Sequence, residues 1–79
     1  MNDEYKTEIK TYLESEKNNI ETALRGEMHL SHLGKDIPNV NLTKALDKIN
    51  TVLQGISDKT IHKYTDIPDY VHNPNKLYN

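Results

Sequence analysis

The sequence predicts an all-α fold: a small helical hairpin or a three-to-four-helix domain, followed by an extended C-terminal tail. Two stretches with helical spacing of apolar residues predict the hairpin, and a stretch rich in Pro and Asn after residue 64 predicts the tail. The 79 residues suffice for one small domain. We therefore expect a helical domain over residues 1–64 and a tail over residues 65–79, which either docks on the helices or binds a partner.

The first predicted helix begins near the N-terminus, where Asn2 or Asp3 can cap it. Its apolar stripe consists of Tyr5, Ile9, Tyr12, Leu13, Ile20, Ala23 and Leu24. Glu16 and Lys17 occupy positions that should continue this stripe. The middle of the helix is therefore expected to pack loosely or to face a short partner.

A short second helical piece is predicted over residues 27–33, ending at Gly34, which suits a left-handed cap. Two interpretations of Gly26 are open: it ends the first helix, or the first helix continues through it. Residues 34–41 have the composition of a connecting loop, in which Pro38 biases Ile37 toward an extended conformation.

The second long helix has the most regular pattern of the chain, and Asn41 is expected to cap it. Its stripe follows the helical template at every position: Leu42, Ala45, Leu46, Ile49, Val52, Leu53 and Ile56. Gly55 weakens the end of this helix. Ser57 or Asp58 could cap a further turn that reaches Tyr64, so either one bent helix or two helices could form.

The composition excludes several classes of protein. Cysteine is absent, which excludes disulfide scaffolds, thiol nucleophiles and Cys-based zinc sites and fits a reducing compartment. No long apolar run is present, so we expect neither a membrane span nor a signal peptide, and we predict a cytoplasmic protein. The many Asn, Lys and Ile residues against a single Arg favour a low-GC bacterium or its phage as the source.

The sequence predicts no metal, no cofactor and no enzymatic activity. His29 and His32 are three residues apart and could share a helical face, but no further ligands follow at a recognised spacing. We expect both to face water near a helix C-terminus. The acidic residues of the first helix are scattered over its polar side, which solvation explains without an acid–base site.

Two amphipathic helices in so short a chain leave apolar surface that the tail, a second copy or another protein must cover. We therefore predict a small protein-binding module that modulates or inhibits a partner protein, with a homodimer as the simplest assembly. The predicted contact residues are five side chains at or after the end of the helical domain and three acidic ones in the first helix: Tyr64, Ile67, Tyr70, Val71, Tyr78, Glu14, Glu16 and Glu21. The alternative for the five is that they close the domain's own core.

A small dimeric DNA-binding regulator is the second functional hypothesis. Four lysines of the second half could contact phosphates: Lys44, Lys48, Lys59 and Lys63. The net charge of −2 and the eight-residue loop over residues 34–41 argue against it, because a helix-turn-helix has a turn of about three or four residues. Nucleic acid is therefore the less favoured partner.

Overall fold

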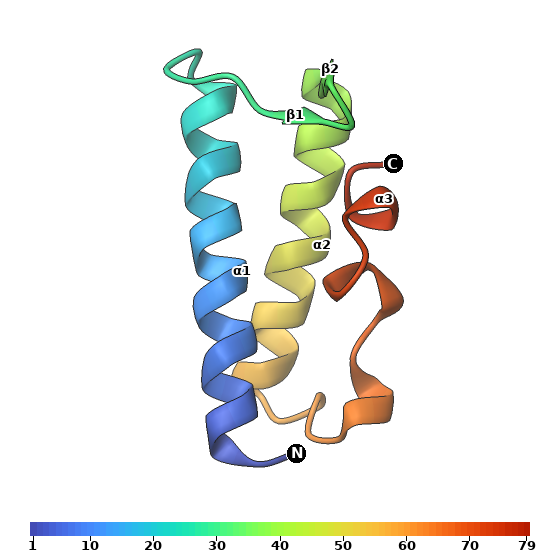
Figure 1. Ribbon diagram of the computed structural model, residues 1–79. Helices are drawn as coiled ribbons and strands as arrows, with labels where there is room; N and C mark the ends of the chain where they lie inside the picture. Colours follow the sequence, from blue (N-terminus) through green and yellow to red (C-terminus); the bar gives the residue numbers. More distant parts are fainter.

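The computed structural model describes all residues, 1–79. Two long antiparallel helices, α1 (Asp3–Leu24) and α2 (Asn39–Ser57), lie side by side, and the last third of the chain runs back beside α2 (Figure 1). Between the long helices lie two short strands, β1 (Ser31–His32) and β2 (Lys35–Asp36). The prediction of a small, mainly helical domain is confirmed, and the structure adds a two-stranded sheet that the prediction did not include.

Helix α1 begins as its sequence predicts. The side chain of Asn2 accepts a hydrogen bond from the backbone N–H of Tyr5 at 2.7 Å, which satisfies one of the free donors of the first turn. Three residues of the stripe, Ile9, Leu13 and Ile20, are buried. The helix ends at Leu24 and does not continue through Gly26, whose φ of 77° is left-handed.

The predicted helical piece over residues 27–33 is wrong. Strands β1 and β2 form an antiparallel β-hairpin there, with Ser31 opposite Asp36 and His32 opposite Lys35. The N–H of Ile37 also donates to the carbonyl of Leu30 at 3.0 Å. Leu33 has a φ of 53°, which a right-handed helix cannot contain, so the chain reverses where the sequence analysis expected a last helical turn.

Helix α2 confirms the most regular pattern of the sequence, although it begins at Asn39, earlier than predicted. Pro38 occupies the N-cap position, and Asn41 does not cap the helix. Its side-chain amide instead donates to the carbonyl of Tyr78 at 2.8 Å, 37 residues along the chain. Four residues of the predicted stripe are buried: Leu42, Ala45, Ile49 and Val52.

The end of α2 depends on Gly55. A Cβ at this position would lie 2.6 Å from Cδ1 of Ile61, so only glycine lets Ile61 approach the helix. The predicted further helical turn from Asp58 does not form, because the chain reverses at Lys59, which has a φ of 66°. Asp58 caps this reversal instead: the N–H and the hydroxyl of Thr60 both donate to its carboxylate and lower its pKa.

The residues from Asp58 to the end of the chain are here called the C-terminal segment (residues 58–79), and the extended tail predicted over residues 65–79 is wrong. They form two 3-10 helices, η1 (Tyr64–Asp66) and η2 (Asp69–Val71), and a short helix α3 (Pro74–Leu77). The prolines that suggested an extended tail stand at helix starts, because a fixed φ and a missing N–H suit the N-terminal positions of a helix.

The core lies between α1, α2 and the C-terminal segment. Val71 and Leu77 of the segment are buried together with seven residues of the long helices, and Ile67, Tyr70 and Tyr78 pack against this cluster. None of the helices combines the length and the apolar character that crossing a membrane requires. The C-terminal segment is thus a third layer that covers the α1–α2 pair.

Candidate protein-interaction surface

The tip of the β-hairpin, which consists of Leu33 and Gly34, has an unusual conformation for its sequence. Both residues have positive φ, 53° and 77°, as in a type I′ turn. Such turns favour Asn-Gly, because leucine in the left-handed region brings its Cβ close to the backbone. Leu33 is also 79% exposed, the most exposed large apolar side chain of the molecule. The tip therefore combines backbone strain with an unburied leucine.

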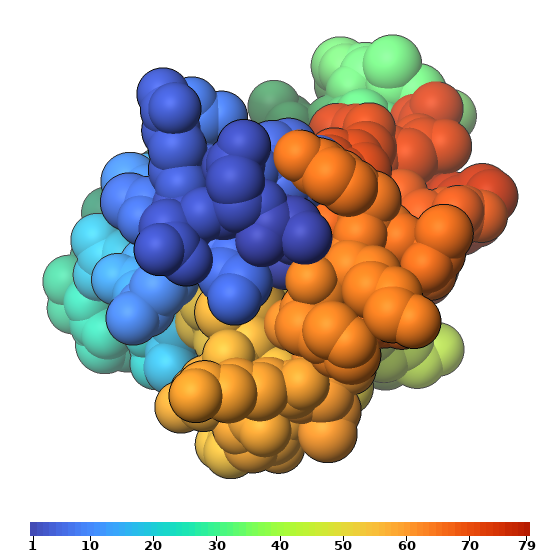
Figure 2. Space-filling view, turned by 90° about the horizontal axis from the view of Figure 1, so that it is seen from below, coloured from blue at the N-terminus to red at the C-terminus, as the bar shows by residue number.

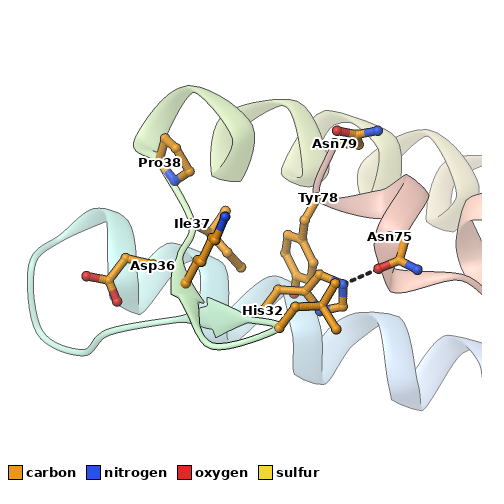
Figure 3. Close-up of a pocket in the computed structure, with 9 residues that line it drawn as sticks. His32, Asp36, Ile37, Pro38, Asn75, Tyr78 and Asn79 are labelled. Atoms are coloured by element: carbon orange, nitrogen blue, oxygen red, sulfur yellow. Dashed lines mark hydrogen bonds between the residues drawn. The ribbon is translucent and has the colours of Figure 1, made fainter.

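The β-hairpin is held in place from both sides. The half-buried side chain of Ile37 packs against the core just after β2. The ring nitrogen Nε2 of His32 is hydrogen-bonded to Oδ1 of Asn75 in α3, the dashed contact of Figure 3. These contacts tie β1 and β2 to the core and to the C-terminal segment, so Leu33 projects from a fixed base.

A shallow pocket of about 420 Å³ lies beside the hairpin tip. Its lining comes from the β-hairpin, the start of α2 and the last residues of the chain: His32, Leu33, Lys35, Asp36, Ile37, Pro38, Asn75, Tyr78 and Asn79. Figure 3 shows the rings of His32 and Tyr78 facing one another, and their centroids are 6.1 Å apart. This tip pocket gives the exposed leucine a partly apolar neighbour surface.

Tyr78 is anchored by Glu16, the residue that interrupts the apolar stripe of α1. The tyrosine hydroxyl donates a hydrogen bond to the glutamate carboxylate at 2.6 Å. Burial raises the pKa of Tyr78 far above its usual range, and the bond to Glu16 and the charge of that carboxylate add to the rise. The break in the stripe therefore marks the docking site of the last residues of the chain, not a loosely packed region.

The predicted contact residues of the C-terminal part do not form one surface. Val71 lies in the core at 3% exposure, and Ile67, Tyr70 and Tyr78 are half-buried against it. Tyr64 alone of these five is exposed, at 56%, and its ring lies 4.7 Å from that of Tyr5 in α1. The structure brings Tyr78 together with Glu16 and leaves the others apart.

The remaining predicted residues lie along the two long helices and the loop that follows α2. Glu14 is exposed and Glu21 half-buried in α1. Of the four lysines named for DNA binding, Lys44, Lys59 and Lys63 are exposed, whereas the ammonium of Lys48 donates to the carbonyl of Lys76 at 2.8 Å. The acidic contact surface and the DNA-binding alternative both stay predictions.

The histidines are distributed over the molecule. His32 contacts α3, His72 accepts or donates a hydrogen bond with Tyr5, and His62 lies near Asp66. No three side chains of the metal-ligating types gather at one point.

Comparison of the chain with protein-family models, with curated proteins and with solved structures finds no match.

Sequence reasoning missed the hairpin tip. Gly34 was the available signal, but a glycine after a helical pattern also suits a helix C-cap. Strands of two residues carry no alternation of apolar and polar side chains that would indicate a β-hairpin. The contact between His32 and Asn75 spans 43 residues, so no local pattern could predict it.

Proposed function

We propose that this chain is a small non-enzymatic protein-binding module that modulates a partner protein, and that the hairpin tip is its main contact. The observation that supports this proposal is Leu33, which is both strained and exposed. Strained backbone and locally unfavourable residues concentrate at functional sites, because the fold tolerates them only where they serve another purpose.

The energetics make Leu33 a suitable anchor. A left-handed conformation costs a non-glycine residue roughly 1–2 kcal/mol, and burying a leucine contributes about 1.5–3 kcal/mol. In the free protein, Leu33 has the cost of its left-handed backbone without the gain from burying its side chain. A partner that buries the side chain supplies the gain, and a preformed turn loses little conformational entropy on binding. The tip pocket can accept a partner side chain beside the anchor.

The substitution Leu33→Asn separates folding from binding. Asparagine suits the left-handed position, so we expect the free energy of unfolding to rise by about 0.5–1 kcal/mol. Binding is expected to fall at least about tenfold, because the buried anchor is lost. Leu33→Met is the matched control, since it keeps an apolar side chain of similar volume on the same turn.

The measurement is affinity capture from lysate of the source organism with the three proteins side by side, together with urea unfolding of each. A protein retained by the original chain and by Leu33→Met, but lost with Leu33→Asn, supports the proposal. Equal recovery with all three proteins, or a destabilised Leu33→Asn variant, would contradict it. Recovery of the chain itself alone, lost in the same variant, would make the partner a second copy.

A further inference from the structure

A second groove, separate from the tip pocket, has the composition of a cation site. It has a volume of about 360 Å³ and lies between α1 and the C-terminal segment. The residues from α1 are Tyr5, Glu8, Ile9 and Tyr12, and Val71, His72 and Pro74 close the other side. Seen from below, the start of α1 lies against the residues that follow α2 (Figure 2). We call this feature the tyrosine groove.

The two tyrosines of the groove differ: Tyr5 is held by contacts within the chain, whereas Tyr12 is exposed. The hydroxyl of Tyr5 is 3.1 Å from Nε2 of His72, and the ring of Tyr5 packs against that of Tyr64. Tyr12 is 40% exposed. Tyr5 and Tyr12 are seven residues apart on one helical face, which separates them by about 10 Å along α1.

Glu8 lies between the two tyrosines on the same face of α1, three residues after Tyr5 and four before Tyr12. Its carboxylate takes part in none of the ion pairs of the molecule, which are Arg25–Glu27, His62–Asp66 and Lys76–Asp69. No lysine or arginine lines the groove. The groove therefore has one unpaired negative charge, two tyrosines and three apolar lining residues, Ile9, Val71 and Pro74.

We propose that the tyrosine groove binds an arginine side chain of a partner protein. The guanidinium group is planar, stacks on aromatic faces and forms two parallel hydrogen bonds with a carboxylate, here Glu8. The aliphatic stem of arginine packs on apolar surface while its charged end reaches the polar group. This site is distinct from the hairpin tip, so it stands or falls independently of Leu33.

Arginine fits the groove better than the other basic side chain. Lysine has a compact, strongly hydrated ammonium that neither stacks on a ring nor pairs with a carboxylate through two bonds. A flat guanidinium can contact the exposed ring of Tyr12 and Glu8 together, because residues four apart lie on the same helical face. The site therefore distinguishes shape as well as charge.

The test uses the full chain and three capped tripeptides: acetyl-Gly-Arg-Gly-amide, its lysine counterpart and its citrulline counterpart. Citrulline keeps the shape of arginine but has no charge. Proton NMR follows the tyrosine ring signals during titration, and we expect the arginine peptide to saturate with a Kd on the order of 1–10 mM. The citrulline peptide should bind at least about tenfold more weakly and the lysine peptide about threefold more weakly.

Two variants localise the binding. Glu8→Gln keeps the size of an exposed side chain and should weaken the arginine peptide about fivefold or more, because the charge-assisted bonds are lost. Glu14→Gln removes another exposed acidic group of α1, outside the groove, and should leave the Kd unchanged. Thermal melts of both variants should match that of the original chain.

Four results would overturn the proposal. Citrulline binding as well as arginine would show that charge plays no part. A lysine peptide that binds more tightly than the arginine peptide would show that the site does not select a guanidinium. An equal effect of Glu14→Gln and Glu8→Gln would indicate general attraction to the acidic helix. Tyrosine signals that do not move in any titration would show that the groove binds none of these side chains.

Discussion

In the α1–α2 pair, side chains reach the core because helical periodicity places them on one face. In the C-terminal segment, Val71 and Leu77 reach the same core from two short helical turns with no common period. The backbone of the long helices is satisfied by its own ladder of hydrogen bonds. The segment depends on distant side chains: Asn41 and Lys48 of α2 donate to its carbonyls, and Glu16 of α1 accepts from its last tyrosine.

This difference indicates how the two regions depend on each other. Short turns of three or four residues are not stable alone, so the C-terminal segment forms only when both long helices present their partners. The long helices in turn need the segment, because it covers the core residues that their contact with each other leaves open. We therefore expect the chain to unfold as one cooperative unit.

The largest expected effect follows from removing residues 66–79. This truncation deletes Val71 and Leu77, each worth about 1.5–3 kcal/mol of burial, and exposes the side chains that they cover. The loss approaches the total stability of a small domain, about 5 kcal/mol. We expect helicity measured by circular dichroism to collapse. A cooperative melt retained by the truncated chain would show that the α1–α2 pair is independent of the segment.

The comparison also explains how far the sequence could predict the structure. The helical pattern of α2 depends only on neighbouring residues, so Leu42, Ala45, Ile49 and Val52 could be assigned to the core correctly. The C-terminal segment carries no such pattern, and whether Val71 and Tyr78 bind the core or a partner could not be decided locally. Glu16 was the one local sign that the end of the chain packs on α1. It interrupts the apolar stripe of α1, and its hydrogen bond with the distant Tyr78 explains that interruption.

The hairpin tip and the tyrosine groove were unpredictable for different reasons. Leu33 and Gly34 suit a helix end as well as a β-hairpin turn, because a glycine with positive φ is common in both. Tyr5 and Tyr12 were assigned to the core stripe of α1, and their spacing is indeed that of one helical face. What the spacing could not show is that His72 and Pro74 lie opposite them and leave a groove open to solvent.

The second prediction concerns the contact between Tyr78 and Glu16. Removing either partner in Tyr78→Phe or Glu16→Gln should lower the free energy of unfolding by about 1–2 kcal/mol, because a half-buried, charge-assisted hydrogen bond is lost. A double-mutant cycle by urea unfolding should show a coupling of about 1 kcal/mol. Additive effects of the two substitutions would mean that the bond does not hold the segment.

The same contact predicts a pH dependence. The pKa of Tyr78 is raised in the folded state, so the unfolded state loses its proton first as the pH rises. The contribution of this tyrosine is complete below its ordinary pKa of 10.0 and is lost progressively above it. Urea midpoints measured between pH 8 and pH 11 should fall, and less steeply for Tyr78→Phe. Part of this fall should persist in Tyr78→Phe, because burial also raises the pKa values of Tyr12 and Tyr70.

The smallest expected effect concerns Lys48. Its ammonium donates to the carbonyls of Lys76, Leu77 and Asn79 at 2.8–3.4 Å, and it lies 5.6 Å from the ring centre of Tyr70. It therefore satisfies the free carbonyls at the end of α3, where a positive charge is favourable. We expect Lys48→Met to lower the free energy of unfolding by about 1 kcal/mol.

The matched control for Lys48 is Lys44→Met, one turn earlier on the exposed side of α2, which should change the free energy of unfolding by less than about 0.5 kcal/mol. The difference between the two variants should shrink in high salt, since screening weakens a partly exposed charge. Equal effects of the two substitutions would mean that apolar side chains alone hold the C-terminal segment. The polar contacts would then select its position on the α1–α2 pair without stabilising it.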